Sequence, residues 1–303
     1  MTYISELTAI CNKYGCCTFL NVSLKNYTTF KVGGNCKLLI SINCVEALQE
    51  VIKYLVDNKV NFEVIGKGSN IIVSDNGFDG VIILFGKDFS EIKVVSDNIL
   101  ECQSGAALKK VCCVALENNM SGLEFAWGIP GTIGGALYMN AGAYGGEMKD
   151  VVLYAEYVNE KGELVRVDKK DMDLAYRHSI FSDNRNMLIV KVVLQLVKND
   201  YNKIKLKMDE LLQKRIDKQP LNFPSAGSTF KRPEGNYASY LIEKCGLKGL
   251  SVGDAQVSEK HSGFIINKGN ATCEDIMKLV SLVQEKVKDD TGYELELEPR
   301  IIK

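Results

Sequence analysis

The chain has 303 residues, of which 46% are hydrophobic and 25% charged, with a formal net charge of -1. This is the composition of a folded globular protein with room for two or three compact units. A nearly neutral chain offers no broad basic surface, so we expect no nucleic-acid partner. Apolar runs fall short of the roughly 20 residues that span a bilayer, and MTYISELTAICNKYG lacks the basic-then-apolar order of a secretion signal. We therefore expect a cytoplasmic protein without membrane contact.

The cysteines and histidines of the chain predict neither disulfides nor a metal site. The ten cysteines form no CxxC pair and lie mostly in apolar surroundings, which favours reduced thiols in the core. His178 and His261 are the two histidines, and they lie far apart in the sequence. Their spacing matches no zinc or di-iron pattern, so we expect no metal.

In chain order, the apolar spacing predicts helices, and short β-branched runs predict strands. The predicted helices cover 45–59, 104–119, 202–220 and the residues that follow Thr272 as N-cap. The predicted strands cover 62–65, 71–73, 81–84 and 188–197, with a hairpin that turns at Lys161-Gly162 and a closing strand over 294–302. Together they indicate a βαβ start, a strand-rich middle and a change of domain near Pro220.

Two glycine-rich segments interrupt this pattern, and the first is the turn VIGKGSN. Gly66-Lys67-Gly68 is similar to a dinucleotide fingerprint, but the third glycine is missing and a strand follows instead of a helix. It is therefore not a Rossmann turn. Its backbone N–H groups, the Ser69 hydroxyl and the Asn70 amide can still face an anion. A plain hairpin that uses glycine for positive φ is the alternative.

The second segment, 122–146, holds eight of the 26 glycines. Gly128, Gly131, Gly134 and Gly135 allow the backbone to approach a ligand closely, and Pro130 stiffens the loop. Such a loop suits a pyrophosphate. A glycine-rich packing corner is the alternative interpretation.

Four polar residues near the chain's prolines and aromatics are candidates for catalysis or binding. Arg177 in YRHSIF suits bidentate recognition of a carboxylate or phosphate, although a solvated arginine is the alternative, and the adjacent His178 is an acid, a base or structural. Ser228 in PSAGSTFKRP lacks a GxSxG elbow and a histidine base, which favours a proton donor over a nucleophile. A loop serine that satisfies the backbone is the alternative. Glu298 lies on the predicted closing strand, either on an exposed edge or at its buried end.

Seven stretches occur in an order that resembles one known family. They are YTTFKVGG, VIGKGSNIIV, GIPGTIGGALYMNAGAYGGEM, YRHSIF, PSAGSTFKRP, GDAQVSEKHSGFIIN and LELEPRII. In this order and over nearly the whole chain, they resemble the UDP-N-acetylenolpyruvoylglucosamine reductases, the flavoenzymes of bacterial cell-wall (peptidoglycan) precursor synthesis.

The resemblance implies an α+β protein with the FAD-binding fold of the vanillyl-alcohol-oxidase (PCMH) type in two subdomains, plus a C-terminal α/β substrate-binding domain. The corresponding limits are 1–75 for the first subdomain, with 291–303 packing back on it, 76–200 for the second, and 201–290 for the substrate domain. FAD is the implied cofactor, NADPH the reductant and an enolpyruvyl ether of a UDP-sugar the small-molecule substrate. We expect a monomer.

The resemblance also assigns roles to individual residues. The implied FAD contacts are Gly66, Lys67, Gly68, Ser69, Asn70, Gly128, Ile129, Gly131, Thr132, Gly134, Gly135, Asn140, Ala141 and Gly142. Flavin N5 is expected to deliver hydride to C3 of the enolpyruvyl group, which leaves negative charge on C2. Arg177 and Glu298 are then expected to stabilise this charge and Ser228 to protonate C2, with Glu298 protonated so that it can donate.

The implied substrate contacts are Tyr176, Lys218, Arg232 and His261. One form of the family has an extra loop after the Tyr-Arg-x-Ser segment, whose tyrosine closes over the substrate. Too few residues follow Phe181 here for that insertion, so the chain resembles the shorter form. Tyr144, Tyr237 and Tyr240 are candidates for the group that closes the site instead.

Two other functions stay open on the sequence alone. A flavin oxidase or dehydrogenase of the same fold could act on an alcohol or sugar, but it would lack the joint set of Arg177, Ser228 and Glu298. A catalytically silent flavoprotein that senses nucleotides is the alternative from a different class.

Overall fold

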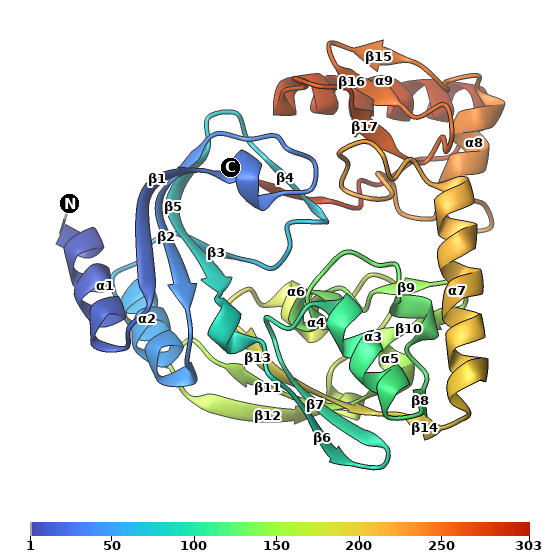
Figure 1. Ribbon diagram of the computed structural model, residues 1–303. Helices are drawn as coiled ribbons and strands as arrows, with labels where there is room; N and C mark the ends of the chain where they lie inside the picture. Colours follow the sequence, from blue (N-terminus) through green and yellow to red (C-terminus); the bar gives the residue numbers. More distant parts are fainter. Residues whose placement is uncertain (1) are drawn as a thin grey trace. The chain divides into compact units, whose positions relative to one another are not determined.

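The computed structural model describes residues 2–303 and divides into two compact units. The first unit comprises the chain up to Leu20 together with 38–67 and 80–214, and the second comprises 21–37, 68–79 and 215–303. Each unit is therefore assembled from three separate stretches. The helices and strands of both units are labelled in Figure 1.

A four-stranded sheet opens the first unit, in the order β1-β2-β5-β3. Its strands are β1 (Cys17–Ser23), β2 (Asn35–Ile42), β3 (Phe62–Ile65) and β5 (Phe78–Phe85), and β3 runs parallel to β5. The helices α1 (Thr2–Lys13) and α2 (Val45–Asp57) lie side by side against it (Figure 1). Leu48, Val51, Ile52 and Leu55 of α2 are buried in their shared core, as the helical spacing predicts.

A five-stranded antiparallel sheet forms the rest of the first unit, in the order β12-β11-β13-β7-β6. Its strands are β6 (Ile92–Ser96), β7 (Ile99–Gln103), β11 (Val152–Val158), β12 (Leu164–Asp168) and β13 (Leu188–Gln195). The helices α3 (Leu108–Glu117) and α4 (Ile133–Tyr138) pack on this sheet (Figure 1). The first half of α7 (Tyr201–Lys218) adds Ile204 and Met208 to the same core.

Short elements connect these layers. They are the 3-10 turns η1 (Leu24–Tyr27), η2 (Lys87–Phe89), η3 (Glu124–Ala126) and η4 (Lys169–Asp171), the strands β8 (Met120–Ser121), β9 (Gly142–Ala143), β10 (Gly146–Glu147) and β14 (Val197–Lys198), and the helices α5 (Met148–Val151) and α6 (Ile180–Asp183).

The second unit packs a three-stranded sheet against two helices. The sheet contains β15 (Ser251–Val252), β16 (Ala255–Val257) and β17 (Ile265–Asn267), and the helices are α8 (Ala238–Lys244) and α9 (Cys273–Thr291). Thr272 caps α9 in a capping box with Asp275, as predicted. A separate parallel pair joins β4 (Ile71–Val73) to β18 (Arg300–Ile302), with Ile72 opposite Ile301.

Most predicted elements are confirmed, and three expectations need correction. The closing strand covers only Arg300–Ile302, because 296–298 pair with 229–231 instead and Pro299 has no N–H for a ladder. The segment 122–146 is not only loop, since it contains α4. The turn at Gly66–Gly68 is not a hairpin, because β3 and β4 belong to different sheets. The three predicted domain limits stay a prediction.

Burial determines the chemistry of several cysteines. All ten are free thiols, and the buried ones are Cys11, Cys16, Cys36, Cys102, Cys112 and Cys273. Desolvation raises the pKa of Cys11 and of Cys102 to about 12, so both stay protonated and unreactive near neutral pH. Over residues 2–303, no helix has both the length and the apolar character needed to cross a membrane.

Candidate active site

The glycine-rich segment of the first unit is organised by the start of α4. The hydroxyl of Thr132 caps the helix and accepts the N–H of Gly135 at 3.2 Å. The N–H groups of Ile133 and Gly134 donate to the carbonyls of Ala106 (2.9 Å) and Ser104 (3.1 Å). The protein therefore already satisfies the first three amides of α4, so a phosphate would be met by other groups of the segment.

Glycine is required for packing at two of the predicted cofactor positions. A Cβ on Gly134 would lie 1.8 Å from the Ser104 Oγ, and one on Gly66 would lie 2.7 Å from the Thr132 Oγ1. The contact of Gly66 with Thr132 also brings the two predicted cofactor segments together within this unit. Gly135 differs, because it is exposed and an added Cβ would meet only the Thr132 hydroxyl, at 3.3 Å. Because Gly135 has no side chain, the backbone of α4 is exposed at this position.

The remaining positions of this segment are held by backbone contacts. Ile129 donates its N–H to Ala126 at 3.0 Å, Gly131 accepts from the Leu108 N–H at 3.0 Å, and Ala141 donates to Ala136 at 2.7 Å. Gly142 lies against Glu147, whose Cβ is 2.8 Å from an ideal Cβ on the glycine. Gly128 lies between Trp127 and Ile129 and is half-buried. In the other predicted cofactor segment, Lys67 is exposed in the turn that follows β3.

Asn140 links the glycine-rich segment to the Tyr-Arg-His-Ser segment. Its side chain is 1% exposed, and its Nδ2 donates to the Glu147 Oε2 at 2.7 Å and to the Ala175 carbonyl at 2.8 Å. Its Oδ1 accepts the N–H of Lys149 at 2.8 Å. Both donors of the amide are thus used inside the protein. Sequence reasoning missed this bracing role, because nothing in the single sequence indicates the contact with Ala175.

Arg177 lies in a closed two-residue turn. The backbones of Ala175 and His178 exchange two hydrogen bonds of 3.2 Å, which leaves Tyr176 and Arg177 between them. Arg177 has φ +57°, the left-handed conformation that costs an L-residue roughly 1–2 kcal/mol. One guanidinium nitrogen lies 3.5 Å from the Gly142 carbonyl, and the guanidinium carbon lies 5.2 Å from the Tyr176 ring centre. Strained conformations of this kind cluster at functional sites.

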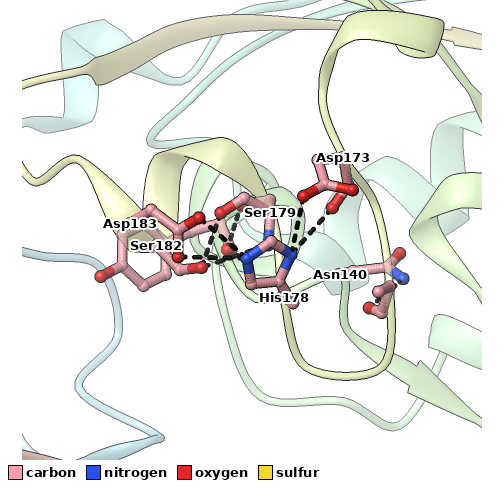
Figure 2. A network of polar contacts seen from close by, with 8 residues as sticks. Asn140, Asp173, His178, Ser179, Ser182 and Asp183 are labelled. Carbon is pink, nitrogen blue, oxygen red and sulfur yellow. Dashed lines mark hydrogen bonds and ion pairs between the residues drawn. The ribbon is translucent and has the colours of Figure 1, made fainter.

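His178 follows directly and is held from both sides (Figure 2). Its Nδ1 lies 2.8 Å from the Asp173 carbonyl, and its Nε2 lies 2.9 Å and 3.1 Å from the two carboxylate oxygens of Asp183. Both partners are acceptors, so only the imidazolium can donate to both. The hydrogen bond with Asp173 has the largest effect and that with Asp183 the next largest, and both raise the pKa of His178 above its ordinary value.

In the second unit, Ser228 and Glu298 lie on neighbouring segments. Glu298 donates its N–H to the Thr229 carbonyl at 2.9 Å, and Lys231 donates its own to the Glu296 carbonyl at 2.8 Å. The side chain of Thr229 is buried and accepts the Ile265 N–H at 2.9 Å. This short antiparallel exchange fixes Ser228 and Glu298 one residue apart in register. Both residues are half-buried.

The rest of the Gly-Lys-Gly-Ser-Asn turn belongs to the second unit. Gly68 has φ +61°, and an added Cβ would lie 2.0 Å from the Tyr27 carbonyl oxygen, so only glycine fits there. Asn70 accepts the Arg300 N–H at 3.0 Å and directs its Nδ2 to the Glu298 carbonyl at 3.4 Å. Ser69, half-buried, joins the two. The turn thereby adjoins the segment that carries Glu298.

The proposed substrate contacts differ in exposure. Tyr176 of the first unit is half exposed, at 50%. Lys218 is exposed at the end of α7, and Arg232 is exposed with its guanidinium carbon 4.5 Å from the Tyr237 ring centre. His261 is half-buried, and its Nδ1 accepts the Gly263 N–H at 3.2 Å. Desolvation, aided by the Lys248 and Lys218 charges, lowers the pKa of His261.

Comparisons with known proteins agree over almost the whole chain. The model described as "FAD binding domain" matches 37–168, and the model described as "UDP-N-acetylenolpyruvoylglucosamine reductase, C-terminal domain" matches 219–302. The reductase of that name from Clostridium tetani is 47% identical over 282 residues, which cover 93% of this chain and 91% of that protein. The one from Clostridium novyi is 44% identical over the same shares.

The chain belongs to the UDP-N-acetylenolpyruvoylglucosamine reductase family. It is an FAD-containing oxidoreductase. The crystal structure of the reductase from Thermus caldophilus has a TM-score of 0.81 and 32% identity, covering 95% of this chain and 99% of that one. The family and cofactor expected from the sequence are confirmed.

The fold is the FAD-binding fold of the PCMH type. Substrate-bound p-cresol methylhydroxylase superposes with a TM-score of 0.51 at 14% identity, over 98% of this chain and 65% of that protein. At this identity the likeness concerns the fold alone. The connection between α6 and β13 covers only 184–187, in keeping with the shorter form of the reductase family.

Two features of the first unit fit a bound FAD. Trp127 lies within the glycine-rich segment, and its indole Nε1 is buried without a hydrogen-bond partner among residues 2–303. A buried donor of this kind calls for an acceptor, and FAD carries several. Gly135, further along the same segment, is exposed and leaves the backbone of α4 accessible. The residues present therefore fit the cofactor.

We expect FAD binding to quench the fluorescence of Trp127, the single tryptophan of the chain. The flavin absorbs where tryptophan emits, so a flavin beside this segment should remove most of the emission. The measurement is a titration of apoprotein with FAD, with ADP as the control ligand because it lacks the flavin ring. Stoichiometric FAD binding that left the emission unchanged would place the flavin away from Trp127.

We also expect the two histidines to titrate on opposite sides of their ordinary pKa of about 6.5. His178 should titrate above it and His261 below it. The stability from His178 is complete below pH 6.5 and is lost as the pH rises through its folded-state pKa. That from His261 is complete above pH 6.5 and is lost as the pH falls toward its folded-state pKa.

The C2–H proton resonances of the two rings report this difference in an NMR titration. The variant His178→Asn assigns the signals by removing one of them. A midpoint below 6.5 for His178 would contradict its hydrogen bonds to two acceptors, and a midpoint above 6.5 for His261 would contradict its desolvation.

Proposed function

We propose that the enzyme reduces enolpyruvyl UDP-N-acetylglucosamine, UDP-N-acetyl-3-O-(1-carboxyvinyl)-glucosamine, to UDP-N-acetylmuramate in peptidoglycan precursor synthesis. The main support is the exchange of backbone hydrogen bonds between 229–231 and 296–298, which holds Ser228 beside Glu298. Family membership supports the substrate, because the relatives carry the name of this reductase. A cytoplasmic location, a monomeric state and a preference for NADPH over NADH stay predictions.

The bound FAD is proposed to be held by the two glycine-rich segments. Gly66–Asn70 and Gly128–Gly142 contribute backbone groups, with the Ser69 and Thr132 hydroxyls in the same stretches. The side chain of Asn140 is used within the protein, so its contribution is proposed to come from its backbone and from the turn that it braces. When bound, FAD supplies the hydride that adds to C3 of the enolpyruvyl group.

Arg177 and Glu298 are proposed to stabilise the negative charge that develops on C2 and spreads into the substrate carboxylate. A guanidinium stays charged at every physiological pH and matches a carboxylate with two parallel N–H groups. Glu298 can donate to this charge only while its carboxyl is protonated. Donors fixed in advance at such a charge lower the barrier, because they do not reorganise during the reaction.

Ser228 is proposed to donate the proton that C2 takes up. Its side chain is half-buried. Gly227 at φ +79° and the buried Thr229 fix the backbone on either side of it. A serine whose backbone is fixed on both sides can donate its proton in a defined direction.

The proposed substrate contacts suit an anionic nucleotide. Lys218 and Arg232 supply positive charge for the diphosphate, and Tyr176 offers a ring and a hydroxyl. His261 is neutral near pH 7, since its pKa is lowered. Its Nδ1 accepts from Gly263, so its Nε2 carries the hydrogen and acts as a donor to the substrate. Tyr144, Tyr237 and Tyr240 are all exposed and stay candidates for closing the site.

We expect the oxidised flavin absorbance to bleach on addition of NADPH and to recover on addition of the enolpyruvyl nucleotide. Stopped-flow absorbance without oxygen measures both half-reactions. NADH in place of NADPH tests the preference between the nicotinamides. A flavin that recovered with an alcohol or a sugar, and not with the enolpyruvyl nucleotide, would instead indicate another oxidoreductase of the same fold.

We expect Ser228→Ala to slow flavin reoxidation by substrate while NADPH still reduces the flavin normally. Loss of a positioned acid typically costs about 10²–10⁴-fold. The matched control is Ser281→Ala, which removes an exposed hydroxyl from α9 in the same unit. If both half-reactions slowed equally in Ser228→Ala, the serine would not be the proton donor.

A further inference from the structure

The turn that carries Arg177 has one charged clamp that the proposed chemistry does not use. His178 closes the turn through its backbone, and its ring bridges the chain before the turn to the helix after it. On one side is the Asp173 carbonyl, 2.8 Å from Nδ1, and on the other is the Asp183 carboxylate of α6, 2.9 Å from Nε2 (Figure 2). The strained Arg177 lies next to it, at φ +57°.

We propose that His178 is a positioning residue, which holds the 175–178 turn through its imidazolium and so presents Arg177 to the substrate. The inference rests on the proposed role of Arg177 in substrate reduction. A left-handed arginine persists only where its surroundings fix the backbone on both sides. After the turn, the fully buried Ser179 donates its hydroxyl to the Tyr138 carbonyl at 2.5 Å. At the start of the turn, the Asn140 side chain donates to the Ala175 carbonyl.

The charge on His178 is what makes the clamp two-sided. A neutral ring with its hydrogen on Nδ1 keeps the bond to Asp173 but turns a lone pair on Nε2 toward the Asp183 carboxylate. The other neutral tautomer loses the bond to Asp173. The charged groups that face the ring are the Asp183 carboxylate and the more distant Asp173 carboxylate, 3.9 Å from Nδ1. Both favour the imidazolium, in agreement with the raised pKa of His178.

Deprotonation of His178 is therefore expected to loosen the turn and to slow substrate reduction as the pH rises. Reduction of the flavin by NADPH should not change, because Arg177 is proposed to act only on the enolpyruvyl substrate. A displacement of about 1 Å in a positioning group can cost on the order of 10²-fold in rate, so we expect a loss of tenfold or more.

Asp183→Asn separates charge from shape. The asparagine amide can donate to a neutral Nε2, so the ring stays bridged after it loses its proton. We expect this variant to lower the pKa of His178 and to abolish the alkaline loss of substrate reduction. His178→Asn removes the bridge and should be slow at every pH. Asp97→Asn is the matched control, because it neutralises an exposed carboxylate of the same unit.

The test measures flavin reoxidation by the enolpyruvyl nucleotide against pH in the FAD-loaded enzyme, together with the NMR titration of His178. The proposal holds if the wild-type rate falls with the midpoint of the His178 titration and if Asp183→Asn removes that fall. It is overturned if the wild-type profile lacks this fall, or if the fall persists unchanged in His178→Asn.

A fourth variant, Arg177→Gln, keeps this test separate from that of the proposed function. If Arg177→Gln reoxidised as fast as wild type, the role of Arg177 itself would be wrong. If Arg177→Gln were slow while His178→Asn behaved like wild type, only the positioning role of His178 would fail.

Discussion

The carboxamide of Asn140 is the interaction on which the candidate chemistry of the first unit depends. Its two donors and its carbonyl oxygen bind the Glu147 carboxylate, the Ala175 carbonyl and the Lys149 N–H, and so join the segment of Glu147 and Lys149 to that of Ala175. A buried amide with all these bonds made is rigid, because moving any partner would leave a polar group unsatisfied. The glycine-rich segment and the arginine turn are thus parts of one polar lattice, which tolerates the strained backbone of both Asn140 and Arg177.

In the second unit, the loop that carries Ser228 is held in place mainly through its backbone carbonyl groups. The segment around Ser228 has no helix or long strand to support it, and its ends are fixed by bonds to distant stretches. Thr29 donates its hydroxyl to the Ser225 carbonyl at 2.6 Å, and Asn267 donates its N–H to the Pro224 carbonyl at 2.9 Å. Together with the Thr229 contacts, these bonds fix the backbone of this irregular loop as a regular element would. Loops held in this way can carry reactive side chains accurately.

Local periodicity was enough to predict several of the regular elements, because burial of one face leaves a repeat in the sequence. The apolar faces of α2, α3 and α9 follow directly from their spacing. The motifs were enough for the family and its cofactor. The predicted length of the closing strand was wrong. The alternation at 294–298 favoured a strand, but Pro299 and the pairing of 296–298 with 229–231 limit the strand to three residues.

What the sequence could not predict are contacts between residues that are distant along the chain. The positive φ of Arg177, the bracing by Asn140 and the ring bridge of His178 have no local signature, because each depends on a partner that only the fold brings near. The division into two units is of the same kind. Each unit combines stretches that alternate along the chain, and local spacing in the sequence carries no record of such an arrangement.

The pairing of β4 with β18 has a consequence for the order of events during synthesis. All three stretches of the first unit have been made once Lys214 is added, whereas β4 acquires its neighbour only when Arg300–Ile302 emerge. At about 5–20 residues per second, translation separates the two strands by on the order of ten seconds or more. During that interval Ile71–Val73 lack their strand partner, on a nascent chain whose first unit can already fold. The order of synthesis therefore makes the first unit available for folding before β4 can pair.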